Sequence, residues 1–240
     1  TLDRSSAASD VYKRQPMLTV LGQVLPEAIG IALSPFPIIG LILMLLSKNA
    51  RKNSLMFMFG WLAGLTIVAF VVVALVNAGR IVAGESTSQT GVLWGKLLLG
   101  IALLFLAFRN WKKRPKAGEQ PEMPKWMTTI DAVQPSRALI LGVLLSGVNP
   151  KNLLLNVAAA GTIAAATLTT TETALVTIVF ILISSITIIG PVLYVQIAGE
   201  RAEKGLDELK VWLLQHNAAI MAVLLLVIGV KLIGDGLGLF

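Results

Sequence analysis

Six long apolar stretches constrain the fold of this chain more than any other feature. They cover residues 18–47, 54–78, 92–109, 138–167, 173–199 and 216–239. A helix needs roughly 20 apolar residues to cross a ~30 Å hydrocarbon core, and the stretches approach or exceed that length. Only 14% of the residues are charged, whereas soluble domains carry about 25%. The sequence therefore predicts an all-α integral membrane protein with six transmembrane helices.

Two proline motifs interrupt the first and fourth stretches. They read Ser34-Pro35-Phe36-Pro37 and Asn149-Pro150-Lys151-Asn152. Proline removes a backbone donor and clashes with the carbonyl one turn earlier, so we expect both helices to break there. The bilayer core holds no water to satisfy freed backbone groups, and such breaks occur where they are buried in protein or line a polar cavity. This pattern favours a transporter.

The motifs divide the chain into two similar halves. Residues 17–109 form the predicted first three-helix repeat, 110–137 a cytoplasmic linker, and 138–240 the second repeat. Because each half has three helices, the second copy runs inverted through the membrane. About ten residues at ~1.5 Å each separate either break from its cytoplasmic end, so both breaks lie ~15 Å deep. We expect them to face each other around one central site.

The distribution of basic residues predicts the orientation. Thirteen Lys and Arg residues lie in the loops 48–52, 109–137 and 201–210, against Arg80 alone in the loops of the other side. By the positive-inside rule these loops are cytoplasmic and both termini are extracytoplasmic. Residues 1–16 are polar and lack periodicity, and we interpret them as a non-native leader. A native extracytoplasmic tail is the alternative.

Lys151 is the strongest candidate for substrate binding. A charged side chain at the bilayer midplane normally faces a cavity or a partner. Lys151 also lies at the start of a half-helix, where free N–H groups favour anions. Together these features suit a carboxylate, phosphate or sulfate group. The structural alternative is that Lys151 pairs with Glu27, Asp235 or a carbonyl, or extends towards the interface.

Polar side chains surround both motifs. Asn149, Asn152 and Asn156 are candidates for hydrogen bonds to substrate, and the last two share one helix face. Bonds between helices are the alternative for them. We expect Ser34 to cap a half-helix that begins near Ile38.

The three motif prolines have a different predicted role. Pro35 and Pro37 shape the cavity in this interpretation without taking a direct part in the chemistry, and Pro150 is counted with the residues of the substrate site. A merely kinked first helix is the alternative.

Three further groups stand out. Glu27 is the candidate for a proton-coupling carboxylate, unless it lies at the outer headgroup level. Gly190-Pro191 should kink the fifth helix and is a hinge candidate. Lys96, Lys231 and Asp235 lie near helix ends, where we expect them to extend towards water.

The sequence offers no catalytic, metal or cofactor site. It has no Cys and one His (His216), no phosphate-binding glycine loop and no zinc motif,. We therefore expect neither an enzyme nor a bound cofactor. The net charge of +7 follows from the cytoplasmic loops and does not indicate nucleic-acid binding.

Several motifs resemble one family. Residues 32–38 (ALSPFPI), 47–53 (SKNARKN), 59–64 (FGWLAG) and 147–153 (GVNPKNL) are similar to signatures of the glycopeptidolipid- and sulfolipid-addressing proteins, within the LysE superfamily of six-helix exporters. The resemblance covers residues 17–240. It implies a bacterial inner-membrane protein that exports a solute or helps to place it at the cell surface, with lipids proposed for some members. An electron-carrying branch has cysteines beside its proline motif, which this chain lacks.

From these observations we expect an exporter of a small or lipidic, anionic solute that works by alternating access. The expected partners are membrane lipids and the solute, with a homodimer or a lipid-export machine as further candidates. A non-transporting scaffold for lipid export is one alternative. A metal-ion or small-cation exporter is another, and it predicts carboxylates converging at the midplane.

Overall fold

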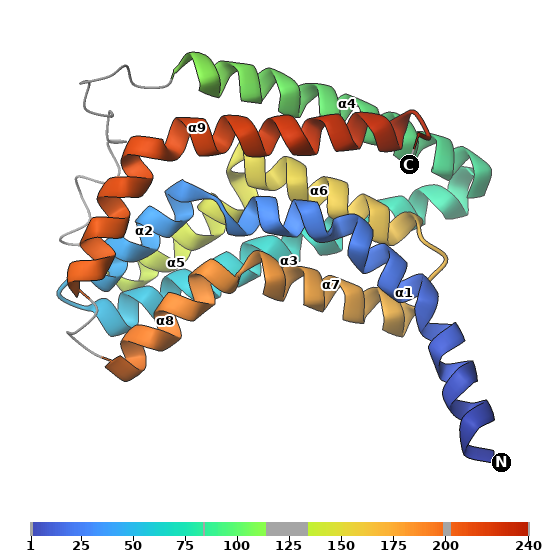
Figure 1. Cartoon of the computed structure of the whole chain (residues 1–240), viewed down its shortest axis with the longest axis horizontal. Coiled ribbons are helices and arrows are strands. Elements are labelled where there is room, and N and C mark those ends of the chain that lie inside the picture. The colour runs from blue at the N-terminus through green and yellow to red at the C-terminus, as the bar shows by residue number, and fades with distance from the viewer. Residues whose placement is uncertain (1, 84, 114–133, 199–202, 240) are drawn as a thin grey trace.

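The computed structural model describes residues 2–83, 85–113, 134–198 and 203–239, and every element among them is a helix. Figure 1 shows an elongated bundle with α4 and α9 side by side along one edge and α7 and α8 along the opposite edge. The elements are α1 (Leu2–Ala32), α2 (Pro35–Leu45), α3 (Ala50–Ala83), α4 (Glu85–Lys112), α5 (Pro135–Val143), the π-helical turn η2 (Leu144–Val148), α6 (Pro150–Ala165), α7 (Thr170–Ser184), α8 (Ile186–Ala198) and α9 (Glu203–Gly236).

Six membrane spans result when each bent helix pair counts as one span. The helices α3, α4 and α9 are each long and apolar enough to cross alone. The pair α1 and α2 bends by 50°, α5–η2 and α6 by 60°, and α7 and α8 by 64°. The predicted breaks in the first and fourth spans are therefore confirmed. The inverted relation of the two halves stays a prediction, and most of the linker lies outside the described residues.

The residues before the prolines cause the first two breaks. Ser34 and Asn149 have ψ angles of 108° and 120°, because the proline ring disfavours the helical conformation of the preceding residue. The next helix then starts at the proline itself, where no N–H is needed. The prediction that the second half-helix begins near Ile38 is wrong for this reason, since α2 begins at Pro35.

The third break was expected at a different place. Pro191 lies inside α8, and the bend is at Ser185, where α7 ends. The kink predicted at Gly190-Pro191 is therefore wrong in position. Polar anchors explain the difference, because Ser185 and Thr187 are hydrogen-bonded to other helices and these bonds hold the start of α8. A hinge role for Gly190 stays a prediction.

Glycine contacts bring the spans close together. A Cβ atom added to Gly60 in α3 would lie 2.0 Å from the Leu139 carbonyl oxygen, and one on Gly142 would lie 2.2 Å from that of Phe57. The helices α4 and α9 meet in the same way at Gly100 and Gly229. Small residues allow this close approach of backbones in membranes. These contacts hold α3 against α5 of the broken fourth span, and α4 against α9.

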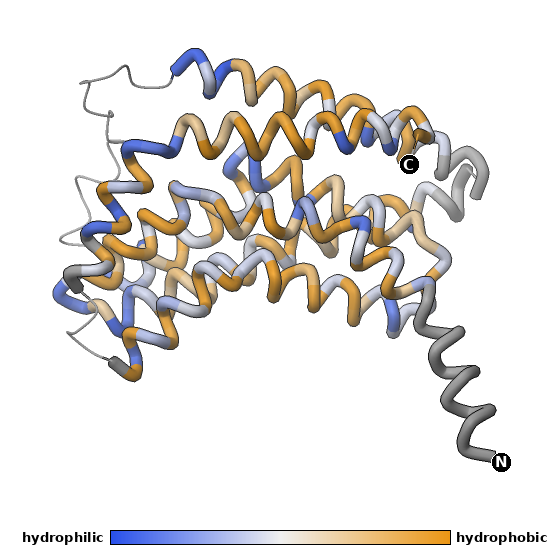
Figure 2. The backbone as a smooth tube through the Cα atoms, in the orientation of Figure 1, coloured by the Kyte–Doolittle hydropathy of each residue, from blue (hydrophilic) through white to orange (hydrophobic). Residues whose placement is uncertain are grey.

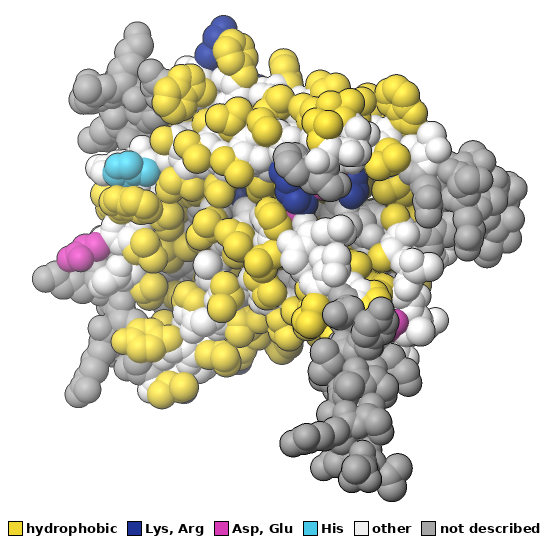
Figure 3. Space-filling view, turned by 45° about the vertical axis from the view of Figure 1, so that its right-hand side comes forward, with side chains coloured by type: hydrophobic (Ala, Val, Ile, Leu, Met, Phe, Trp, Pro, Cys, Tyr) yellow, Lys and Arg dark blue, Asp and Glu magenta, His cyan; other side chains and the backbone are white. Residues whose placement is uncertain are grey.

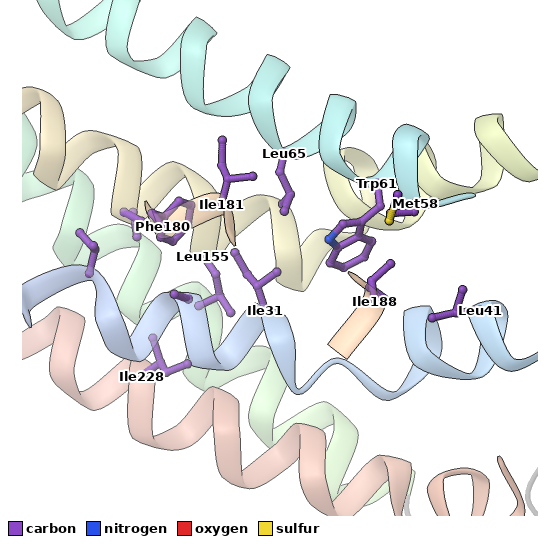
Figure 4. Packing of buried hydrophobic residues seen from close by; sticks show 14 of the residues in the cluster. Ile31, Leu41, Met58, Trp61, Leu65, Leu155, Phe180, Ile181, Ile188 and Ile228 are labelled. Atoms are coloured by element: carbon purple, nitrogen blue, oxygen red, sulfur yellow. The ribbon is translucent and has the colours of Figure 1, made fainter. Parts of the chain in front are cut away.

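The surface and core follow the membrane environment. Figure 4 shows the buried core, in which Trp61, Leu155 and Phe180 pack between the spans. Large side chains such as Phe70 and Ile197 are exposed instead, as expected for helices that face lipid. Figure 2 shows hydrophilic segments gathered at the end of the bundle where α2 ends and α9 begins. This is the end that the basic loops were predicted to occupy.

Candidate functional site

The first two breaks meet at Lys151. Its side chain extends from the first turn of α6 and is only 2% exposed. The ammonium donates hydrogen bonds to the Gly30 carbonyl oxygen of α1 and, at 2.7 Å, to Ser34 Oγ. The last turn of α1 carries this carbonyl because its helix stops before Pro35. The predicted approach of the two motifs is thus what the structure shows.

Ser34 and Asn152 extend this network. Ser34 Oγ donates a 2.6 Å bond to Asn152 Oδ1, and Asn152 Nδ2 donates to the Leu145 carbonyl oxygen at 2.9 Å. Both side chains are fully buried. Ser34 makes no capping bond to α2, so the predicted capping role is wrong. Its hydroxyl instead links the two breaks, because it accepts a bond from Lys151 and donates one to Asn152.

The other two asparagines have separate positions. Asn149 caps α6, since its Oδ1 accepts a 3.2 Å bond from the Lys151 backbone N–H. Asn156 Nδ2 donates to the Leu65 carbonyl oxygen of α3 at 3.0 Å, while Asn156 Oδ1 is buried without a hydrogen-bond partner among the described residues. Buried polar atoms of this kind mark places where water or a ligand binds.

The prolines differ in exposure. Pro35 and Pro37 are buried beside the network, whereas Pro150 is exposed.

The third break joins the same region. Thr187 Oγ1 donates a 2.6 Å bond to the Ala32 carbonyl oxygen, and Trp61 Nε1 donates a 3.0 Å bond to Ser185 Oγ. Sequence reasoning did not assign Thr187, Trp61 or the Gly30 carbonyl to the site. The sequence signal that could have found Thr187 is the group Ser184, Ser185 and Thr187, three hydroxyl residues within the apolar stretch 173–199. Carbonyls freed before a proline need donors, and buried hydroxyl groups can supply them.

Lys151 has no counter-ion in the described part of the chain. No acidic side chain there lies within ion-pair distance of its ammonium. The predicted alternative of a carbonyl partner is borne out by Gly30, and pairing with Glu27 or Asp235 is not what the structure has. A buried charge costs several kcal/mol unless it is compensated. The site is therefore suited to an anion that brings the missing charge.

Glu27 belongs to a separate charged cluster between α1, α4 and α9. Its carboxylate accepts a 2.8 Å bond from Lys231 Nζ, and its exposed fraction is 1%. Asp235 lies between Lys231 at 3.4 Å and Lys96 at 3.6 Å. The prediction that these lysines extend to water is wrong, because the four groups neutralise each other instead. The carboxylates required for a cation site are thus not at the breaks, and no metal-type cluster occurs among the described residues.

Comparison with known families identifies the chain. The model of the sulfolipid-1-addressing protein family, Sap, matches residues 24–238. The chain belongs to this family. The match contains both breaks and all three buried residues that link them, Ser34, Lys151 and Asn152. The predicted family is therefore confirmed. No curated protein and no solved structure matches the chain.

Proposed function

We propose that this member of the Sap family exports an anionic, lipidic solute from the cytoplasm by alternating access. In this proposal it acts in the bacterial inner membrane with both termini outside, like exporters of the LysE superfamily. The family name connects it to a sulfolipid. The sulfate group of such a lipid would supply the negative charge that Lys151 has no partner to provide. The observation that carries the proposal is the buried Lys151 side chain, which has no acidic partner among the described residues.

The hydrogen bonds around Lys151 suggest how substrate enters. In the structure, the ammonium is held by Gly30 and Ser34. An arriving sulfate or phosphate group replaces these neutral acceptors with a charged one, and the ammonium gains the attraction of an opposite charge at hydrogen-bond distance. The bonds between the two breaks then open as the anion binds. Movement of one half against the other exposes the site to the opposite side.

The test is transport by the purified protein in liposomes. A fluorescent anionic lipid, labelled phosphatidylglycerol, is placed in the membrane, and its movement between leaflets is followed by chemical quenching. We expect the wild-type protein to move the lipid and Lys151→Met to move it severalfold more slowly. Lys112→Met is the matched control, because Lys112 lies at the end of α4 over the Phe108 ring, far along the chain from the breaks.

Two outcomes would contradict the proposal. If Lys151→Met transports at the wild-type rate while folded, Lys151 has no part in the mechanism. If the wild-type protein moves no lipid alone but restores lipid export in cells, it is a scaffold for another system.

A further inference from the structure

Two cavities outside the central site meet at Lys96. The first, of about 560 Å³, lies between α1, α4 and α9 and is lined by Gln23, Lys96, Lys231 and Asp235 among others. The second, of about 380 Å³, lies between α3, α4 and α6. Apart from Lys96 its lining is valine, leucine, alanine and glycine. A charged chamber and an apolar chamber thus share one lysine.

Lys96 is the cation in this cluster with capacity for another ligand. Lys231 is held by the Gln23 carbonyl oxygen at 2.6 Å, by Glu27 and by Asp235. Lys96 contacts only Asp235, at 3.6 Å, among the described residues. An ammonium has three N–H donors, so Lys96 retains donors for an anionic group in the chamber.

The apolar chamber has the form of a groove for a hydrocarbon chain. Four glycines line it, and four valines and Leu99 supply much of its remaining apolar wall. A Cβ atom added to Gly79, Gly91, Gly95 or Gly161 would meet nothing within 4 Å. These glycines therefore leave space and do not serve close helix packing, unlike Gly60 and Gly142.

The position also suits an amphiphile. Lys96 lies six residues inside the span Thr90–Lys112, which is ~9 Å from its end at ~1.5 Å per residue. Because half of a ~30 Å core is ~15 Å, this depth lies between the headgroup boundary and the bilayer midplane. Figure 3 shows a face on which hydrophobic side chains cover most of the described surface and Lys or Arg side chains gather near its middle.

We propose that the two chambers form one site for a membrane lipid with an anionic headgroup. Lys96 binds the headgroup, and one acyl chain lies in the glycine-lined groove. The further idea that this lipid is cargo near its exit rests on the proposed function, whereas binding itself does not.

Photo-crosslinking tests the site. The full-length protein is placed in phosphatidylcholine nanodiscs that contain phosphatidylglycerol with a diazirine on one acyl chain. We expect crosslinks in 72–79, 91–99 and 157–161. Gly161→Leu fills the groove without a backbone clash and should reduce them severalfold. Gly22→Leu is the matched control, because Gly22 is exposed, has equal space and lines neither chamber.

A second variant tests the headgroup. Lys96→Gln should lower labelling by the phosphatidylglycerol probe to the level of a phosphatidylcholine probe, while Lys151→Met should leave labelling unchanged. The proposal is overturned if neither Gly161→Leu nor Lys96→Gln lowers the crosslinking yield. It is also overturned if the crosslinks are distributed evenly over the exposed helix surfaces. Transport without this labelling refutes the site alone, whereas labelling without transport refutes the proposed function alone.

Discussion

At the scale of the residue, a buried lysine, Lys151, and a half-buried one, Lys231, have different partners and define the chemistry of this protein. Lys231 is neutralised by Glu27 and Asp235, which makes it part of the fold. Within the part of the chain that the structure describes, the Lys151 ammonium has only the Gly30 carbonyl and the Ser34 hydroxyl as partners. The same substitution at the two positions therefore separates a structural lysine from a ligand-binding one.

We expect Lys151→Met to stabilise the protein. It removes an uncompensated buried charge, which costs several kcal/mol, and leaves the Gly30 carbonyl unpaired at a cost of about 1–3 kcal/mol. The first effect is larger. Lys231→Met instead leaves the buried Glu27 carboxylate without its partner, and we expect a loss of about 3 kcal/mol.

Thermal and denaturant unfolding in detergent measures both variants. Equal destabilisation by the two substitutions would mean that Lys151 is a structural tie between the breaks.

At the scale of the element, glycines have two opposite uses. In α3 and α5 they let two backbones touch, as Gly60 and Gly142 do. Along α3 and α4 other glycines, such as Gly79 and Gly95, face open space. Only the structure shows which helices Gly60 and Gly64 contact.

Alanine substitution distinguishes these uses. Gly60→Ala places a methyl group against the Leu139 carbonyl, where neither backbone can yield locally, so we expect a loss of roughly 1–3 kcal/mol, as for overpacking. Gly79→Ala meets no atom and should gain about 0.5–1 kcal/mol from helix propensity. Unfolding midpoints of the two variants check this. A Gly60→Ala variant as stable as the wild type would contradict the close α3–α5 contact.

At the scale of the whole molecule, thirteen Lys and Arg residues belong to the loops of one end and Arg80 alone to those of the other. The α2–α3 connection is at the basic end, and the α6–α7 connection is at the other. The proposed direction of export requires the basic end to face the cytoplasm. The chain has no Cys, so a single introduced cysteine reports its own position without background.

Cysteine labelling checks the orientation. An impermeant maleimide should label Thr167→Cys, between α6 and α7, in intact cells. Asn49→Cys, between α2 and α3, should react only after the membrane is opened. Both native side chains are exposed. A difference in labelling therefore reports the side of the membrane and not burial of the residue. The reverse pattern would invert the topology and the direction of transport.

Much of the fold was predictable because the bilayer imposes simple rules. Apolar length predicts spans, and proline predicts breaks, since both act through a few neighbouring residues. The exception was the fifth span. Its break lies at Ser185 and not at Pro191, because bonds from distant helices decide where a polar residue is held.

The sequence by itself determined the six spans, the two proline breaks, the resemblance to the family and Lys151 as a cation at membrane depth. Only the tertiary structure decided that Lys151 binds a carbonyl and not Glu27. The same holds for Ser34, which donates its hydrogen bond to Asn152 and does not cap its own helix, and for Lys96, which lines two cavities. The reason is physical. Local backbone preferences act between neighbours in the chain, whereas the partner of a buried polar group depends on which helices pack together.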